Sequence, residues 1–266
     1  MTEDLAPDGG WVPGGPALYA ARMAANLGAK VKLITRVSTG YDRTVFEGIE
    51  VHALPAETAC RYSNRYDETG ARTQLLLAPG EPIALAELEA EDADALVIAP
   101  GYHEFEAVPQ AGAKVRAVML QGPLRATDGQ RVIAHPNPEH QARPLVTPGS
   151  FAFLSEEDTP DADGLARWLA KTGANVFVTR AQRGASLFRD DSRVDLAAVR
   201  TAGVVDPTGA GDCFAMAFVV RIVETGDIEV ASRFALAAGS LAVEGPGVAG
   251  IPGRAAIERR LGAEAA

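Results

Sequence analysis

The sequence predicts an α/β fold built around a mostly parallel sheet. From Ala95 onward, short β-branched or aromatic runs alternate with stretches expected to be helices, in the order ALVIAP, EFEAVPQAG, KVRAVMLQG, SFAFLS, DADGLARWLAKTG and NVFVTR. Parallel strands need a crossover connection, usually a helix, so this alternation predicts βαβ units. Ligands of such sheets bind at the carboxyl ends of the strands, where Gly101, Gly122 and Ser155 fall.

The segments before Ala95 predict one more helix, one more buried strand and a small lid. Residues 17–27 are alanine-rich and predict a helix, and VKLITRV at 31–37 predicts a buried strand. Between 43 and 80 the segments are short and partly alternating, separated by Pro55 and by a turn, DETG, at 67–70. Such a pattern is typical of hairpins with one face in water. We therefore expect a β-rich lid over 43–80.

The rest of the chain, residues 1–42 and 81–266, is expected to form one α/β core. Its last part predicts three helices, at about 211–225, 228–244 and 254–262.

Composition excludes several classes of function. The chain has 266 residues, 47% of them hydrophobic, which is enough for a sizeable core. Its formal net charge of −10 argues against nucleic acid as a partner, because phosphate-backbone binding needs a basic face, and favours a small ligand. We find neither a signal-peptide pattern nor an apolar run of the roughly 18 residues that a membrane span needs. Cys60 and Cys213 fit neither a disulfide framework nor a zinc site, so we expect a soluble, cytoplasmic protein.

The stretch DPTGAGDCF at 206–214 is the most informative in the chain. Asp206 and Pro207 open it, Gly209, Ala210 and Gly211 form a turn without bulky side chains, and an apolar helix follows. Such a turn aims backbone N–H groups at one point before a helix N-terminus, where the helix dipole also favours an anion. Asp212 then lies beside the anion as a candidate base for an attacking hydroxyl. The alternative is a glycine-rich loop in which Asp206 or Asp212 only caps a helix.

The full set of motifs resembles the PfkB (ribokinase-like) family of carbohydrate kinases. DPTGAGD is similar to the family's C-terminal signature, and GGPALYAARMAANLGA at 14–29 is similar to its diglycine motif. FAFLSEED at 151–158 resembles its N-x-x-E segment, and VFVTRAQRGASLF at 176–188 resembles its nucleotide-edge strands. The order and spacing agree over nearly the whole chain. The resemblance implies a ribokinase-like three-layer fold, with a mostly parallel sheet flanked by helices and a small β lid.

The resemblance also implies roles for the residues of the anion loop. Asp212 takes the place of the catalytic base, and Gly209, Ala210 and Gly211 take the place of the anion hole. Asp206 is expected to fix the loop, and in some relatives its neighbourhood helps to hold a monovalent cation.

Nucleotide and metal positions follow from the other motifs. Ser155 and Asp158 occupy the N-x-x-E positions that organise Mg²⁺ and phosphate in the family. An acidic N-cap for the helix near 160 explains the segment equally well. Glu156 or Glu157 could take the metal role in place of Asp158. Gly184 falls where the family places a glycine against the nucleotide, although a plain hairpin turn explains it nearly as well. Gly245 and Gly247, in AVEGPGVAG, fall where relatives wrap a loop around the adenine.

On the substrate side, Asp4, Gly14, Gly15 and Asn64 match the family's sugar-contacting places. Carboxylate and amide groups suit vicinal hydroxyls. Tyr19 stands where the diglycine motif usually carries asparagine, which weakens an assignment to ribose and leaves another sugar, a polyol or a nucleoside open. Arg125, in LQGPLR after a strand, is expected by default to be a solvated surface residue, and the alternative is that it reaches toward substrate or phosphate.

The resemblance implies an ATP- and Mg²⁺-dependent kinase that phosphorylates a hydroxyl of a small sugar, polyol or nucleoside. It also leaves a homodimer through the lid as one option for the assembly. The alternative is a catalytically silent ribokinase-like domain that binds a nucleotide or sugar. TEDL at 2–5 resembles the end of the family's first strand without its apolar beginning. We expect a version extended upstream by a completed strand to be more stable.

Overall fold

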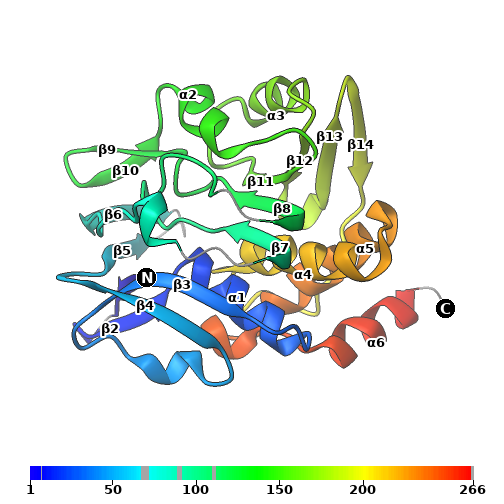
Figure 1. Ribbon diagram of the computed structural model, residues 1–266. Coiled ribbons are helices and arrows are strands. Elements are labelled where there is room, and N and C mark those ends of the chain that lie inside the picture. Colours follow the sequence, from blue (N-terminus) through cyan, green and yellow to red (C-terminus); the bar gives the residue numbers. More distant parts are fainter. Residues whose placement is uncertain (7, 67–71, 89–91, 110–111, 265–266) are drawn as a thin grey trace.

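The main sheet of the protein has six strands. In the computed structural model, which describes all residues except 7, 67–71, 89–91, 110–111 and 265–266, they follow the order β14-β13-β12-β11-β8-β7 (Figure 1). The four strands β7, β8, β11 and β12 are parallel, and β13 and β14 add an antiparallel hairpin at one edge. Their bounds are β7 Ala93–Ile98, β8 Ala113–Met119, β11 Phe151–Ser155, β12 Asn175–Thr179, β13 Ala185–Arg189 and β14 Ser192–Leu196.

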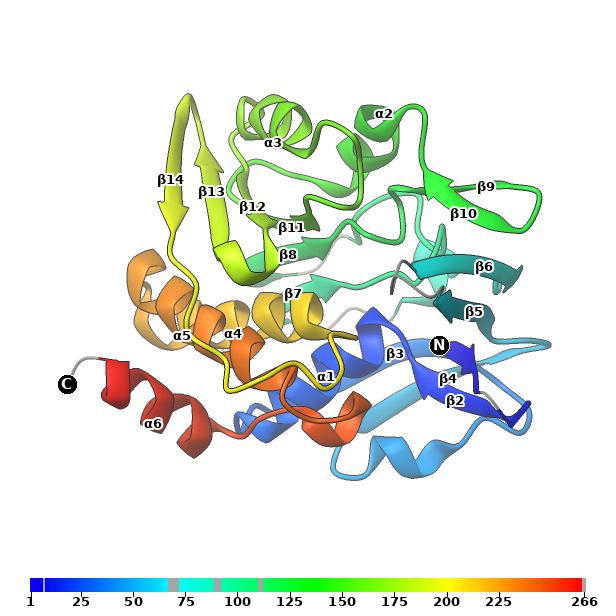
Figure 2. The same cartoon turned by 180° about the vertical axis from the view of Figure 1, so that it is seen from behind.

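Helices cover both faces of this sheet, which gives three layers (Figures 1 and 2). One face packs against α1 (Pro16–Asn26), α4 (Ala210–Thr225) and α5 (Ile228–Ala242), with α6 (Arg254–Glu264) outside them. The other face packs against α2 (Pro138–Ala142) and α3 (Ala162–Ala170). On the first face, rings from β11, β12 and α4 form an aromatic cluster with edge-to-face, tilted and stacked contacts: Phe151, Phe153, Phe177, Phe214 and Phe218. Such packing fixes α4, and so the loop before it, on the sheet.

A second six-stranded sheet lies beside the main one, in the order β2-β1-β5-β6-β10-β9. Only β5 and β6 come from the segment expected to form the lid. The sheet also takes in the chain start and a hairpin that follows β8, because β1 pairs with β5 and β10 pairs with β6. The bounds are β1 Thr2–Leu5, β2 Trp11–Gly14, β5 Cys60–Tyr66, β6 Arg72–Ala78, β9 Arg125–Asp128 and β10 Arg131–Ala134.

Two strands form a separate parallel pair, β3 (Lys32–Ser38) and β4 (Glu50–Ala56). Strand β4 therefore joins the layer of the core, although its sequence lies within 43–80.

Other local expectations have different outcomes. Residues 101–109, which fall in the segment expected to hold a helix, form bends, and Pro100 and Pro109 bracket them. The DETG turn lies outside the described residues. No helix in the part of the chain that the structure describes is long and apolar enough to cross a membrane.

Candidate active site

The loop 206–212 forms the N-terminal entrance of α4. Gly209 is its N-cap, with φ 77° in the left-handed region that favours glycine, and Ala210, Gly211 and Asp212 make up the first turn. The Asp206 carboxylate joins the loop 206–212 to the loop 245–250, because it accepts hydrogen bonds from the backbone N–H of Thr208 (2.9 Å) and of Gly247 (2.9 Å). A Cβ placed on Gly211 would meet open space. The Ala210 N–H donates to the Pro207 carbonyl (3.3 Å), and the first turn of α4 presents its other N–H groups at the helix end, where the dipole favours an anion.

Tyr19 of α1 packs directly beneath this loop. A Cβ on Gly209 would lie 2.1 Å from its ring, so only glycine fits there. Burial, and then the negative charges of Asp206, Asp4 and Asp212, raise the pKa of the Tyr19 hydroxyl. Tyr19 therefore stays neutral and lies between the anion loop and the start of the chain.

Asp212 lies within electrostatic reach of a second carboxylate, Asp158, and of the Arg125 guanidinium. Desolvation raises the pKa of Asp212 to about 7, with Arg125 opposing the shift and Asp158 adding to it. The pKa of Asp158 is also raised by desolvation, against a hydrogen bond from the Ser155 N–H (2.7 Å) and the charge of Arg125. A carboxylate with a pKa near 7 is matched to proton abstraction at neutral pH.

Asp158 is oriented by the end of strand β11 and does not cap α3. The N-cap of α3 is Asp161, whose carboxylate accepts from the Gly164 N–H (2.8 Å). Glu156 is engaged elsewhere, in ion pairs with Arg180 and Arg183. Of the three acidic side chains that follow Ser155, Asp158 is thus the one whose charge acts on Asp212 and Arg125.

Arg125 is part of this constellation, and its expected place on the solvated surface is wrong. It begins β9, donates to the Gly101 carbonyl (3.2 Å) and lies over the Tyr62 ring, 4.9 Å from the ring centroid. Its charge lowers the pKa of both Asp158 and Asp212. The sequence favoured the surface because the groups around Arg125 come from β5, the turn after β11 and α4, far away along the chain. The signal for the alternative was its position three residues after the predicted strand KVRAVMLQG.

The substrate-side residues also come together. Asn64 of β5 donates to Oδ1 of Asp4 in β1 (3.0 Å), and Gln74 of β6 donates to Oδ1 of Asn64 (2.9 Å). Gly14 abuts the Asp4 carboxylate, since a Cβ there would lie 2.8 Å from Oδ2. Gly15 has φ 87°, caps α1 and packs on Thr2. The charges of Asp4 and of the anion-loop carboxylates both raise the pKa of Tyr19, after its burial.

The remaining glycines have local backbone reasons for their identity. Gly184 has φ 90°, and a Cβ there would lie 2.0 Å from the Leu196 carbonyl oxygen, so the β12–β13 turn requires glycine. Gly245 packs against Gly250, while Gly247 donates to Asp206 as described. These contacts connect the 245–250 loop to the anion loop.

Comparison with known proteins places this site in a family. The family model described as pfkB family carbohydrate kinase matches residues 150–252, which include Ser155, Asp158, Gly184 and the whole anion loop. Ribokinase from Bacillus subtilis (strain 168) is 28% identical over 94% of this chain and 88% of its own. The predicted resemblance to the pfkB family of carbohydrate kinases is thus confirmed by this match and this relative.

Two further comparisons extend along most of the chain. Cytidine kinase from Thermococcus kodakarensis is 25% identical over 86% of this chain and 88% of its own. A pyrophosphate-dependent kinase of the ribokinase family, solved with a pyrophosphate analog and myo-inositol, superposes with a TM-score of 0.72 at 22% identity over 92% of this chain and 93% of its own. The ribokinase-like fold is thereby confirmed, and the protein is a phosphotransferase with an alcohol acceptor, a sugar or nucleoside kinase.

Proposed function

We propose that this kinase transfers the γ-phosphoryl group of ATP directly to a hydroxyl of a small sugar, polyol or nucleoside, without a phospho-enzyme. The observation that carries the proposal is Asp212, a carboxylate with a pKa of about 7 in the first turn of α4, next to the backbone N–H groups of the anion loop. A base and an anion site at one helix end are what in-line transfer to an alcohol requires.

The proposed step uses three groups of this chain. Asp212 accepts the proton of the substrate hydroxyl. The hydroxyl oxygen of the substrate attacks the γ-phosphorus, and the bond from this phosphorus to the oxygen that bridges it to the β-phosphate breaks. The N–H groups of Gly209, Ala210 and Gly211 take the charge that develops on the transferred group. Arg125, whose charge already acts on Asp212, is placed to neutralise the same oxygens. Product ADP leaves with the bridging oxygen.

The acceptor side supports a polyhydroxylated substrate. Asp4 and Asn64 are hydrogen-bonded to each other and offer carboxylate and amide groups, which pair with neighbouring hydroxyls as acceptors and donors. Tyr19 is buried beneath Gly209, and it stands where the family's diglycine motif usually carries asparagine. Another sugar, a polyol and a nucleoside are therefore the candidate acceptors.

The donor side supports a nucleotide. Val204 and Val205, just before the anion loop, are 55% and 66% exposed, and Val205 N–H binds the Val243 carbonyl (2.7 Å), next to the 245–250 loop. Exposed apolar side chains beside an anion site suit a purine ring. Gly184, Gly245 and Gly247 are the backbone positions proposed to lie near it. Pyrophosphate is the competing donor, because the compared kinase solved with myo-inositol uses it.

A Mg²⁺ ion fits the oxygen donors of this site. Asp158 has a partly buried carboxylate, and Ser155 adds a hydroxyl at the end of β11. Mg²⁺ prefers oxygen ligands and keeps several waters, so a single carboxylate suffices on the protein side. Bound there with the donor phosphates, it would neutralise their charge. A monovalent cation near Asp206 is a further proposal from the family resemblance.

The assembly is also a proposal. Apolar side chains are exposed on the second sheet, among them Trp11 (37%) and Val12 (52%) of β2. A homodimer through this sheet would cover them, and light scattering after size exclusion would detect it.

The experiment is a donor and acceptor matrix. ATP, GTP and pyrophosphate are each offered with pentoses, hexoses, inositols and nucleosides, and phosphorylated product is identified by ³¹P NMR and mass spectrometry. We expect an ATP-dependent product with at least one cyclic polyol or nucleoside. Turnover only with pyrophosphate would overturn the ATP donor. Binding of nucleotide or sugar without any product would favour the silent binding protein.

A further inference from the structure

Tyr62 is a buried tyrosine of β5, in the second sheet, and it contacts Arg125. It is 2% exposed, and burial raises the pKa of its hydroxyl, which therefore stays neutral. The Arg125 guanidinium lies over its ring, 4.9 Å from the ring centroid. The Tyr62 hydroxyl donates to the Gly101 carbonyl (2.7 Å), and Arg125 donates to the same oxygen (3.2 Å). Arg125 is thus held both by the ring of Tyr62 and by the carbonyl that the Tyr62 hydroxyl binds.

The turn after β7 fixes the Gly101 carbonyl that Tyr62 and Arg125 share. The Glu104 carboxylate accepts from the backbone N–H groups of Gly101 (3.2 Å) and Tyr102 (2.8 Å), which closes the turn. The turn also packs against the start of β1, because a Cβ on Gly101 would lie 2.6 Å from Oγ1 of Thr2. The carbonyl is therefore a fixed acceptor, and it gives the guanidinium a defined place.

The same turn holds the backbone of Arg125 through His103. The Nε2 atom of His103 lies 2.7 Å from the Arg125 carbonyl oxygen. A carbonyl only accepts hydrogen bonds, so Nε2 carries the proton and donates. The His103 ring packs edge-on against Tyr102, with the ring centroids 4.3 Å apart. Both the main chain and the side chain of Arg125 are thus bound to residues 101–103.

These contacts keep Arg125 off the two carboxylates of the site. An arginine close to a carboxylate favours a bidentate ion pair with it, and the Arg125 charge acts on both Asp158 and Asp212. Among the residues that the structure describes, however, the guanidinium contacts Gly101 and Tyr62 and forms no ion pair with either carboxylate. A guanidinium has more N–H donors than one carbonyl uses, so Arg125 retains donors for phosphate oxygens.

We propose that Tyr62 is a positioning residue for phosphoryl transfer, which holds Arg125 apart from the carboxylates and ready for the phosphate oxygens at the anion loop. This inference rests on the proposed function, in which Arg125 neutralises those oxygens. Asp4 pairs with Tyr62 between β1 and β5, and Asn64 follows two residues later on the same face of β5. One strand therefore carries both a proposed acceptor contact and the residue that places the arginine.

The experiment is a double-mutant cycle on kcat, with a donor and acceptor pair that gives product in the matrix. Arg125→Met removes the guanidinium, and we expect a loss of about 10²-fold or more. Tyr62→Leu removes the ring and the hydroxyl but leaves the guanidinium, and we expect a loss of about tenfold. The double variant should lose no more than Arg125→Met alone, because Tyr62 then has no arginine to position.

Tyr62→Phe guards against poor folding of the leucine variant, since it keeps the ring over Arg125 and removes only the hydroxyl. We expect it to lose about threefold in kcat, and to lose nothing further when combined with Arg125→Met. Tyr41→Phe is the matched control, because Tyr41 is also buried and its hydroxyl donates to a backbone carbonyl, that of Thr2 (3.4 Å). It should keep parental turnover.

The outcomes separate this inference from the function on which it rests. Losses that multiply in the double variants, or parental kcat in both Tyr62 variants, would overturn the positioning role while the kinase function stands. Parental kcat in Arg125→Met would overturn the role of the arginine in phosphoryl transfer and the inference with it. A parent chain that gives no product with any pair in the matrix would overturn the proposed function itself, and the inference falls with it.

Discussion

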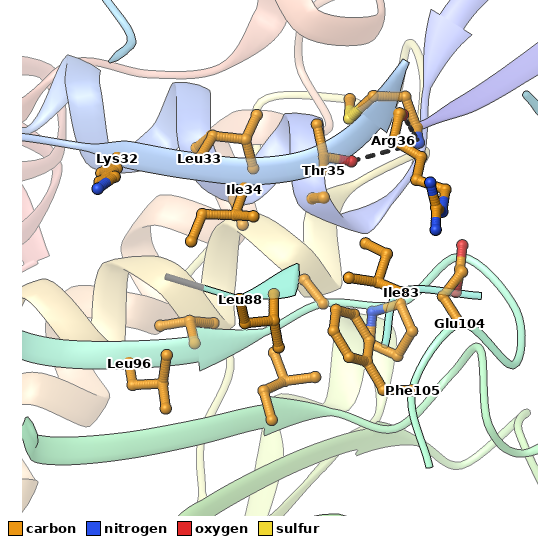
Figure 3. Close-up of a pocket in the computed structure, with 18 of the residues that line it drawn as sticks. Lys32, Leu33, Ile34, Thr35, Arg36, Ile83, Leu88, Leu96, Glu104 and Phe105 are labelled. Atoms are coloured by element: carbon orange, nitrogen blue, oxygen red, sulfur yellow. Dashed lines mark hydrogen bonds between the residues drawn. The ribbon is translucent and has the colours of Figure 1, made fainter. Parts of the chain in front are cut away.

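The two ends of the parallel layer differ in how completely they are packed. In β11 and β12 the first four residues are all buried, and their aromatic rings stack on α4. In β7 only Ile98 is buried, and in β3 the first three residues are half-buried, beside a groove of about 520 Å³ that lies between these two strands (Figure 3). One end is a closed core with partners on every side, and the other end is open. Residues in an open sheet edge contribute less burial and leave backbone groups exposed.

The residues proposed for phosphoryl transfer and for substrate binding lie at different ends of this layer. Asp212, Ser155 and Asp158 lie in or just after α4 and β11, at the closed end, where packing fixes their positions. Asp4 lies in β1, next to Met1, which is hydrogen-bonded to β3 at the open end. We infer that phosphoryl-transfer groups are rigidly placed while substrate contacts depend on how well the chain start is held.

The largest expected effect tests the closed end. Replacing Asp212 with Asn keeps the size of the side chain but removes the proton acceptor, so turnover should fall by about 10² to 10⁴. Asp161→Asn is the matched control, because this carboxylate only caps α3. Steady-state kinetics with the substrate found in the matrix gives the answer. Near-parental turnover of the Asp212 variant would remove it from the mechanism.

A second test separates the anion hole from helix stability. Gly211→Val places a β-branched side chain in front of the N–H groups, and we expect a loss of about 10² or more in turnover. Gly262→Val in α6 is the control, since both glycines are helical and a Cβ at either meets open space. Circular dichroism should show both variants folded. Equal turnover of the two folded variants would show that the loop does not hold phosphate.

Truncation of one leucine at each end of the layer measures how tightly the two ends are packed. Leu154 of β11 is 3% exposed, whereas Leu96 of β7 is only partly buried beside the groove. Leu154→Ala should lower the free energy of unfolding by about 2 to 5 kcal/mol, and Leu96→Ala by about 1 kcal/mol. Urea unfolding measures both. Equal losses would mean that the groove end is as tightly packed as the core.

Much of this molecule could be predicted from local patterns. The DPTGAGDCF stretch, the buried strands β11 and β12, and the helices α1, α3, α4 and α5 each follow from periodicity, small residues or caps within one segment. These signals are local, so the sequence carries them whole. The burial of Arg125 depends on Tyr62 and Gly101, and the pairing of β4 with β3 depends on a register between distant segments. Long-range pairing leaves no such local trace.

The smallest expected effect concerns the cost of holding Asp212 in the site. Its folded pKa, about 7, lies above the ordinary value of 3.8, so the folded state binds the proton more tightly than the unfolded chain does. The free energy of unfolding therefore falls as pH rises from about 3.8 to about 7, and the ionised carboxylate destabilises the folded state above that range. Asp212→Asn removes this destabilising charge.

We therefore expect Asp212→Asn to melt above the parent at pH 8 and together with it at pH 4. Because Asp212 is partly exposed, solvent reduces the gain to about 1 kcal/mol, or about 2 to 4 °C in a chain of this size. Differential scanning fluorimetry at the two pH values makes the comparison, with Asp161→Asn again as the control. A variant that melts below the parent at pH 8 would mean that the Asp212 carboxylate is stabilised where it lies, and that its readiness to accept a proton at neutral pH has another origin.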